Sequence, residues 1–367
     1  MAKILKSYGL NVIILSGIYY HPEPFCKKVG KYKSIKYYLP SVYPKTASKI
    51  KRTYYRLAHT WRVTCILIYL KNKWGKIHYI FEDNSTPFPF LFLLDWLGVI
   101  DLIFNLEEWP LSHNISYKRK LWSHFFIVCA FKKCKKIVCV SSYLIAQAIK
   151  YNKKSRGFKL PALTEFNELK CETLIKADDK QNKITRFLYC GHVGYSEVIE
   201  TIIGAYENIC RLRKNVKVEL LLILHGDELK LQKISDYASR LEYPIKIKSK
   251  LSEADLFAEY SQASVLLAPL RLTDQDRARF PQKIAEYVSL SKPIITTCVG
   301  DIDQYFEPDK SAIFIDDFSV SELQKKMNYA IDNNEKIVGI GVEGNASGRK
   351  YFDYKKYITR FGDFVTS

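Results

Sequence analysis

The sequence has no acidic side chain between Pro24 and Phe81, although lysine and arginine recur throughout this stretch. The whole chain of 367 residues carries 57 Lys and Arg against 38 Asp and Glu, a formal net charge of +19. This balance favours polyanionic partners, namely nucleic acid, anionic lipid headgroups or phosphorylated substrates. A solvated, lysine-rich surface is the alternative. A biased genomic composition would explain part of the charge but not its uneven placement.

Paired cysteine spacing is missing as well. The nine cysteines are scattered, no two have Cys-x-x-Cys spacing, and their number is odd. Neither a disulfide framework nor a zinc site is therefore indicated, and a reducing cytoplasm is expected. The first residues also lack the charged-then-apolar order and small-residue cleavage site of a signal peptide.

Long apolar runs are absent too. The most apolar stretch, 88–104, contains Asp95 and Asp101. It is shorter than the roughly 20 apolar residues that a membrane-spanning helix needs. It predicts a buried helix followed by a buried strand, in a protein that is soluble or peripheral to a membrane.

Short apolar runs alternate with helical patterns along the chain, which is typical of α/β folds with parallel sheets. Strands are expected at 11–16, 77–82, 101–106, 136–142, 186–191, 218–226, 243–249, 264–270, 292–298 and 312–316. Helices are expected at 88–97, 116–133, 196–213, 228–240, 252–262, 281–290 and 318–332. Polar, turn-rich residues 166–185 interrupt the pattern and predict a linker between domains at 1–165 and 186–345. Each domain should bind ligands at the carboxyl ends of its strands.

The start of the chain is unusual for such a fold. Nucleotide-binding α/β domains usually open with a strand and a glycine-rich turn. The opening "MAKILKSYGLNVIILSG" instead favours the end of a helix, a turn at Gly9 and then a strand. This interpretation implies that the usual first strand is missing. The alternative is that residues 2–5 form a short first strand.

One segment, "RFPQKIAEYVSLSKPII" at 279–295, combines features that suit a nucleotide. Pro281 fits the first position of a helix, whose unpaired N–H groups and dipole attract anions. Arg279 and Lys283 add positive charge where a diphosphate would lie. Glu286 follows on the same helix, and its carboxylate can accept hydrogen bonds from both ribose hydroxyls. An amphipathic surface helix with solvated Lys and Glu is the alternative.

The same segment, extended to "RFPQKIAEYVSLSKPIITT", resembles the donor-site segment of GT-B glycosyltransferases of family 4, also called group 1. Other segments resemble this family in the same order, and the resemblance is strongest from 187 to 316. They are "FLYCGHVGYSEVIETIIGAYENI", "LLLILHGDE" and "LSEADLFAEYSQASVLLAPLR" in the second half, and "IFNLEEWP" and "IVCVSSYL" in the first.

The resemblance implies an α/β fold with two Rossmann-like domains. The N-terminal domain would bind the acceptor and the C-terminal domain the nucleotide-sugar, and a helix over 346–367 would cross back to the N-terminal domain. It implies that Glu286 binds the ribose and that Arg279 and Lys283 meet the diphosphate. It also implies a retaining reaction with no required metal and no cofactor, the nucleotide-sugar being a substrate.

The glycine turn after the first strand of the second domain supplies further candidates. Gly191 and Gly194 would let the backbone approach the donor. His192 would hydrogen-bond a donor phosphate, or alternatively cap the following helix. Two departures from the family are plain. Ala278 stands where the family often has an acid, and Tyr195, Ser196 and Glu197 stand where it often has a lysine. They leave open a divergent enzyme that uses Arg279 and Lys283, or an inactive partner subunit.

In the first domain, "NLEEWPLSH" follows an expected buried strand and supplies Glu107, Glu108 and His113 as candidate catalytic residues. A carboxylate or imidazole there could orient an acceptor hydroxyl or stabilise an oxocarbenium ion. The alternative for the two glutamates is a helix N-terminus, which favours acids. The alternative for His113 is a plain loop position.

The acid-free stretch interleaves its cations with aromatic residues. This mixture suits an anionic membrane surface and also single-stranded nucleic acid. Because the second half resembles a nucleotide-sugar domain, we expect a membrane contact through residues 24–81 and no nucleic acid. The full expectation is sugar transfer to a lipid-linked glycan acceptor in surface polysaccharide biosynthesis, at the inner face of a bacterial membrane. An inactive GT-B partner subunit and a basic nucleic-acid-binding protein are the alternatives.

Overall fold

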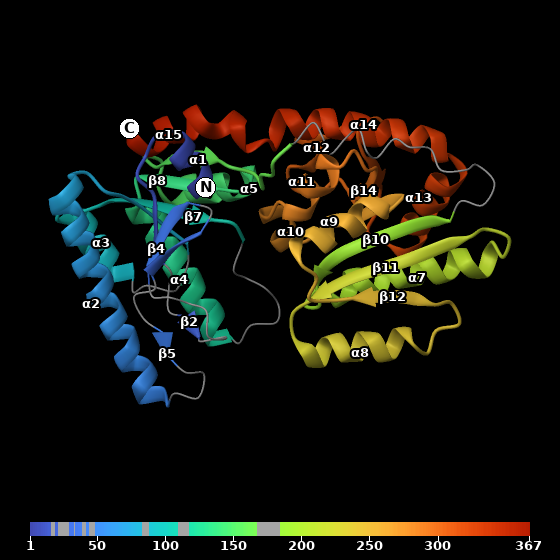
Figure 1. The fold of residues 1–367 in the computed structure, drawn as a ribbon, viewed down its shortest axis with the longest axis horizontal. Helices are drawn as coiled ribbons and strands as arrows, with labels where there is room; N and C mark the ends of the chain where they lie inside the picture. The colour runs from blue at the N-terminus through green and yellow to red at the C-terminus, as the bar shows by residue number, and fades with distance from the viewer. Residues whose placement is uncertain are drawn as a thin grey trace. The chain divides into compact units, whose positions relative to one another are not determined.

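The computed structural model describes residues 1–15, 19–20, 29–32, 34–38, 42–43, 48–82, 88–108, 117–166 and 184–367. Contacts within the chain separate two compact units (Figure 1). The first comprises residues 1–160 and 354–367, and the second comprises residues 161–353. Most of the predicted linker, residues 167–183, lies outside the described residues.

The second unit is built on a six-stranded parallel sheet in the order β12-β11-β10-β13-β14-β15. The order reverses direction beside β10, as in Rossmann-type folds. Its strands are β10 (Thr185–His192), β11 (Val218–His225), β12 (Ile245–Lys248), β13 (Val265–Ala268), β14 (Ile294–Thr297) and β15 (Ile313–Ile315). The connecting helices are α7 (Ser196–Leu212), α8 (Glu228–Ala238), α9 (Glu253–Gln262), α10 (Asp274–Ala278), α11 (Gln282–Ser289), α12 (Ile302–Tyr305), α13 (Val320–Asp332) and α14 (Asn334–Tyr351).

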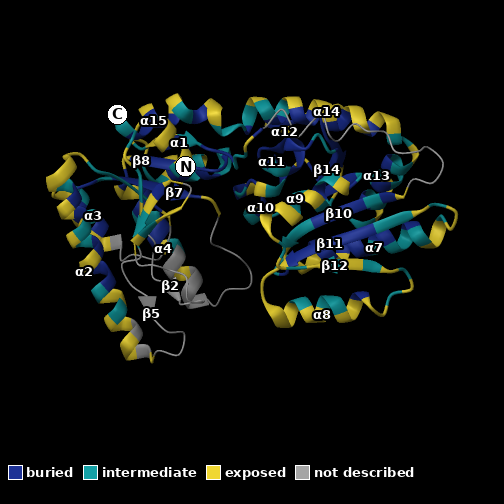
Figure 2. Ribbon diagram, viewed as in Figure 1, coloured by how far each residue is buried: buried dark blue, intermediate teal, exposed yellow. Residues whose placement is uncertain are grey.

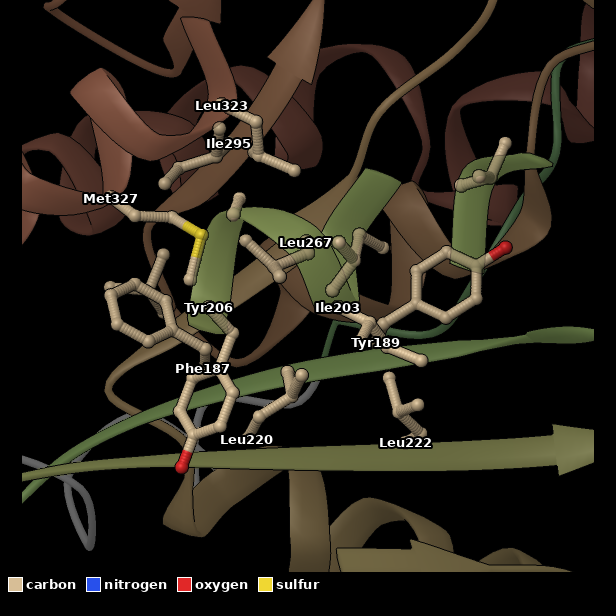
Figure 3. Close-up of a cluster of buried hydrophobic side chains, with 14 of the residues drawn as sticks. Phe187, Tyr189, Ile203, Tyr206, Leu220, Leu222, Leu267, Ile295, Leu323 and Met327 are labelled. Carbon is tan, nitrogen blue, oxygen red and sulfur yellow. The ribbon is translucent and has the colours of Figure 1, made fainter. Parts of the chain in front are cut away.

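A continuous apolar core holds this unit together. Strands β10 and β11 pair in register along their whole length, with Leu188 opposite Leu221. They are buried on both faces (Figure 2), which explains why they are nearly continuous apolar runs. On one face, side chains of α7 and α13 such as Ile203 and Met327 meet Leu220 and Leu267 of the sheet (Figure 3). This packed core holds the carboxyl ends of the strands in fixed positions.

The first unit contains a four-stranded parallel sheet in the order β6-β7-β8-β9. Its strands are β6 (His78–Phe81), β7 (Asp101–Leu106), β8 (Lys136–Cys139) and β9 (Arg156–Lys159). A second sheet has the order β1-β4-β3, with β1 (Ile13–Leu15), β3 (Val29–Tyr32) and β4 (Ile35–Tyr38), and β2 (Tyr19–Tyr20) pairs with β5 (Val42–Tyr43). The helices are α1 (Ala2–Ser7), α2 (Lys49–Trp74), α3 (Phe88–Trp96), α4 (Tyr117–Lys133), α5 (Ser142–Tyr151) and α15 (Ile358–Thr366).

The start of the chain is a helix, a glycine turn and a strand. Helix α1 ends before Gly9, which adopts a φ of +102° that suits glycine, and β1 follows. The expectation of a helix end and a turn is therefore confirmed, and the alternative of a strand over residues 2–5 is wrong.

Two helices depart from the sequence expectations. Helix α2 was not predicted, although Ser48 caps its start and Gly75 with a φ of +78° ends it. Its apolar positions lie on two faces, so they give no single amphipathic stripe. The single helix expected over 346–367 is instead the end of α14, a short 3-10 turn at Tyr354–Tyr357 and α15. The break is at Phe352, which is fully buried and whose carbonyl accepts from Thr164 N–H at 3.0 Å.

None of the helices in the described part of the chain is both long and apolar enough to cross a membrane.

Candidate functional site

The carboxyl edge of the second unit's sheet gathers the candidate site. Strand β10 ends at His192 between β11 and β13, at the point where the strand order reverses. Ligands of open α/β sheets bind at such points. Helix α11 begins beside it, with Pro281 as its N-cap rather than at the first helical position that the sequence predicted. The anion-attracting end of this helix is thus next to the end of β10.

Lys283 ties α11 to β10. Its Nζ donates to the Cys190 carbonyl oxygen at 3.0 Å and lies 3.9 Å from the centre of the Tyr189 ring. Burial lowers the pKa of Lys283 from its usual 10.5 to about 7, and the neighbouring charge of Arg279 acts in the same direction. The amine is therefore ready to take up a proton when an anion arrives.

Arg279 is held in place by an acid and an aromatic ring. Its Nη2 lies 3.0 Å from Asp276 Oδ1, and its guanidinium lies 4.1 Å from the centre of the Tyr195 ring. Its buried Nε has no hydrogen-bond partner. A buried donor without a partner is costly, so Arg279 keeps one N–H that an incoming anion could satisfy.

Asp276 anchors two arginines. It is fully buried and also accepts from Arg271, at 3.0 Å from Nε and 2.8 Å from the backbone N–H. Arg271 in turn lies 3.5 Å from Glu197. Asp274 and Asp276 have Asp-x-Asp spacing, but the Asp276 carboxylate is committed to guanidinium groups. Its role here is to position Arg271 and Arg279.

Glycine is required around His192. Gly194 N–H donates to His192 Nδ1 at 2.9 Å, so in the neutral ring the proton is on Nε2. A Cβ at Gly226, whose φ is +127°, would lie 2.6 Å from His192 Nε2. A Cβ at Gly191 would overlap the Tyr189 ring. The imidazole is thus held among backbone groups at the ends of β10 and β11.

Glu286 lies one turn beyond Lys283 on α11. Burial raises the pKa of Glu286, and a hydrogen bond from Gln282 opposes this effect. The adjacent Tyr287 is fully buried and its hydroxyl accepts from Cys190 N–H at 3.1 Å. The structure therefore brings all six predicted donor residues, Gly191, His192, Gly194, Arg279, Lys283 and Glu286, to one edge of the sheet.

The predicted acceptor residues belong to the first unit. Glu107 and Glu108 follow β7 directly and are exposed. Asn105 donates to Glu107 and to Glu82, each at 3.2 Å, so it draws two carboxylates together at the carboxyl ends of β6 and β7. His113 lies outside the described residues.

Several site residues were missed by the sequence analysis. Asp276 and Arg271 were not assigned roles, nor were Tyr195 and Gly226. Their places in the sequence are the signal that could have found them. Arg271 closely follows the strand "VLLA", and Gly226 directly follows the strand "VELLLILH". At Ala278, where the family often has an acid, the side chain is fully buried.

Comparison with known proteins agrees with this geometry. Residues 172–341 match the family model of the glycosyl transferases group 1. The resemblance to this group is thereby confirmed for the segment that contains the site, and it supports glycosyl transfer. No curated protein matches the chain.

Solved structures confirm the GT-B fold over the whole chain. Sucrose-phosphate synthase from Thermosynechococcus elongatus superposes with a TM-score of 0.75 at 14% identity, over 100% of this chain and 90% of that one. Anabaena HepE in complex with UDP and glucose superposes with a TM-score of 0.64 at 13% identity, over 91% of this chain and 87% of that one. Trehalose 6-phosphate synthase from Burkholderia multivorans superposes with a TM-score of 0.67 at 13% identity, over 96% of this chain and 90% of that one.

Proposed function

We propose that this protein is a retaining glycosyltransferase that moves a sugar from a nucleotide-sugar to a lipid-linked glycan acceptor, in surface polysaccharide biosynthesis. The observation that carries the donor half is the pair of cations at the end of β10. Arg279 has a buried N–H without a partner, and Lys283 is held at the Cys190 carbonyl oxygen. Both flank the start of α11, where the helix dipole adds to their charge.

The chemistry follows from these charges. A diphosphate leaving group gains negative charge as the glycosidic bond breaks, and fixed cations in a partly buried site stabilise that charge. Arg279 and a protonated Lys283 supply this stabilisation without a metal ion. Glu286 accepts hydrogen bonds from the ribose hydroxyls. The departing diphosphate helps to deprotonate the acceptor hydroxyl. Glu107 and Glu108 orient the acceptor from the first unit.

A nucleotide screen tests the donor half. UDP, GDP, ADP, CMP and their sugars are added and the melting temperature is measured, UDP being the first candidate because the structurally similar HepE was solved with it. One nucleotide should raise the melting temperature, and Glu286→Ala and Lys283→Ala should abolish the rise. Lys325→Ala, on the exposed face of α13, is the matched control. Failure of every nucleotide to bind would refute the donor site.

The membrane half rests on helix α2. Residues Ile50, Tyr54, Leu57, Trp61 and Ile68 follow one another at spacings of three, four or seven and are all exposed, Trp61 by 70%. This set, the α2 stripe, lies opposite the buried face of the helix, which includes Val63 and Leu67. The helix has no acid and carries cations throughout. Because two such helices would repel each other, an anionic lipid surface suits the stripe better than a second copy.

Vesicle flotation tests this contact. Vesicles of phosphatidylglycerol should carry the protein at low salt, and the bound fraction should fall at moderate salt and with phosphatidylcholine alone. Tyr54→Ala with Trp61→Ala should reduce binding. Leu229→Ala, at an exposed apolar position on α8, should not. Absence of binding to anionic vesicles at low salt would remove the membrane contact from the proposal.

An inactive partner subunit is the second candidate, and buried Ala278 favours it. Asp276 cannot replace the missing acid, because its carboxylate is held by Arg271 and Arg279. This candidate predicts that a nucleotide binds but that neither transfer to an acceptor extract nor hydrolysis of the nucleotide-sugar is detected. Measurable turnover would exclude it.

A further inference from the structure

The first unit has a second stretch of sequence without acids. No Asp or Glu occurs between Glu108 and Glu165, whereas lysine and arginine recur through it. In the described part of this stretch, exposed cations gather in the last turns of α4 and α5 and around the starts of β8 and β9. We call them the amino-edge patch: Lys132, Lys133, Lys135, Lys150, Lys153, Lys154 and Arg156.

Hydrogen bonds hold the segments of the patch together. The Arg156 backbone N–H donates to the Lys135 carbonyl oxygen at 2.8 Å. The Asn152 side-chain amide donates to the Lys132 carbonyl oxygen at 3.3 Å. In the sheet, Lys136 of β8 lies opposite Arg156 of β9. The seven cations therefore project from one small region at the amino edge of the sheet.

The neighbours of the patch do not neutralise its charge. In the described part of the chain, no carboxylate is paired with any of the seven cations. Arg156 donates to the hydroxyl of Ser367 at 2.9 Å, which is an uncharged partner. The adjacent Lys136 differs, because it is buried and donates to Asp101 at 2.8 Å. The chain thus turns one lysine inward to an acid and leaves the patch to the solvent.

The helix ends explain only part of this charge. A helix dipole favours lysine in the last turn, which accounts for Lys132 and Lys133 of α4 and Lys150 of α5. The other four cations follow the helix ends, where this effect fades. Like charges that are gathered in one region repel each other and weaken the folded state. A polyanion bound across the patch would remove that repulsion.

The side chains between these cations narrow the kind of polyanion. A bilayer contact is strengthened by exposed apolar side chains that insert, such as those of the α2 stripe. Within residues 132–156, Ile149 is the one large apolar side chain that is exposed. Single-stranded nucleic acid stacks its bases on aromatic rings, but Tyr143 and Tyr151 are partly buried. The patch therefore suits a polymer that carries charges along its length and is held by them alone.

The patch lies at the opposite edge of the sheet from the candidate acceptor residues. Glu107 and Glu108 follow the carboxyl end of β7, whereas the patch surrounds the amino ends of β8 and β9. Strand β8 has four residues, so the two edges are about 13 Å apart. A polymer that reaches both edges must be longer than this distance.

We propose that the amino-edge patch binds an anionic glycan, a polymer with carboxylate or phosphate groups along its length. The end of the bound glycan reaches Glu107 and Glu108, so the patch holds the acceptor at a distance from its reacting hydroxyl. This inference rests on the proposed transferase function, which makes the polymer a glycan. It adds that the acceptor is a polyanion and that it is longer than about 13 Å.

Binding of a labelled anionic glycan tests the proposal on the whole protein. The probe is fluorescein-labelled polygalacturonate, which carries a carboxylate on each sugar, and fluorescence anisotropy gives its Kd. The wild type should bind the probe at low salt and more weakly as salt screens the charges. Labelled dextran, which is uncharged, should not bind.

Two variants with the same loss of charge show where the probe binds. The patch variant should raise the Kd about tenfold, because each exposed ion pair is worth about 1.5-fold to fivefold. The control variant removes exposed lysines of the second unit and should change the Kd by less than about twofold. The patch variant carries Lys133→Gln, Lys135→Gln and Lys154→Gln, and the control variant carries Lys214→Gln, Lys230→Gln and Lys233→Gln.

Two results of these binding measurements would overturn the proposal. Equal Kd values for the two variants would show that only the net charge of the protein matters. The second result is a patch variant that keeps its affinity for polygalacturonate but loses binding to phosphatidylglycerol vesicles or to an oligothymidylate. The patch would then serve a membrane or a nucleic acid instead.

Nucleotide binding and transfer separate this proposal from the donor site. The patch variant should bind a nucleotide as the wild type does. In transfer to an anionic acceptor it should have a raised KM for the acceptor and an unchanged kcat, and an unchanged KM would overturn the acceptor role. If polygalacturonate binds at the patch but no nucleotide binds to the protein, the glycan site is supported and the transferase is refuted.

Discussion

Replacing Lys283 by methionine should make the protein more stable and weaken its binding of a nucleotide. The pKa of Lys283 is about 7 instead of 10.5. At about 1.4 kcal/mol per unit, this difference corresponds to at most about 5 kcal/mol for charging the buried amine. The side chain keeps part of its surface exposed, and methionine loses the hydrogen bond to Cys190, worth about 1 kcal/mol. We expect Lys283→Met to raise the free energy of unfolding at pH 7 by about 1–3 kcal/mol.

The pH dependence identifies the cause. Because the folded-state pKa is below the unfolded value, the unfolded chain binds more protons between about pH 7 and 10.5. The free energy of unfolding of the wild type should therefore rise with pH across this window and be flat below it, as far as Lys283 contributes. Lys283→Met should lack that part of the rise. Urea unfolding at pH 7, 8 and 9 measures the difference between the two proteins.

Donor binding gives the second readout. A diphosphate favours the charged amine, so binding should take up a proton and weaken as the pH rises above about 7. Calorimetry in buffers of different ionisation enthalpy detects this proton. Lys283→Met should bind the nucleotide at least about tenfold more weakly, because one charged hydrogen bond is lost. Lys325→Met should change neither the nucleotide affinity nor the proton uptake. A less stable Lys283→Met with unchanged nucleotide affinity would refute the reasoning.

Three further predictions concern single carboxylates. Glu286→Ala should bind a nucleoside diphosphate and its 2′-deoxy form equally by calorimetry, whereas the wild type should prefer the ribose form; a preference that survives would place the ribose elsewhere. Asp276→Asn should lower the free energy of unfolding by about 3–5 kcal/mol in urea, because it leaves two arginines without their buried acid, while exposed Asp274→Asn should change it by less than about 0.5 kcal/mol. In the first unit, hydrogen bonds from Lys136 and His78 lower the pKa of Asp101 against the opposing effect of burial. The stabilisation from Asp101 is therefore present above its unfolded pKa and lost as the pH falls through the folded one. Asp101→Asn should be less stable at pH 7 but lose less stability in acid, and a parallel pH profile for the two proteins would contradict this.

Most elements of the parallel sheets could be predicted because their strands are buried on both faces. Residues 101–106, for example, are mostly apolar, and they form β7 with the predicted bounds. Helix α2 could not be predicted in this way, since it buries one apolar face and exposes another. A period of 3.6 residues is lost when two opposite faces are apolar.

The site divides in the same manner. The sequence alone predicted the cations, the glutamate and the glycines of the proposed donor edge, because each of these residue types has few ways to serve a phosphate, a sugar or a tight backbone turn. Tertiary structure alone decided that Asp276 fixes Arg271 and Arg279, and that Lys283 reaches Cys190.

It also decided that β1 and β6 belong to separate sheets and line one cavity. The reason is physical: the charge state of a buried amine and the pairing of a strand edge depend on what packs beside them. Those neighbours come from parts of the chain that local sequence patterns cannot bring together.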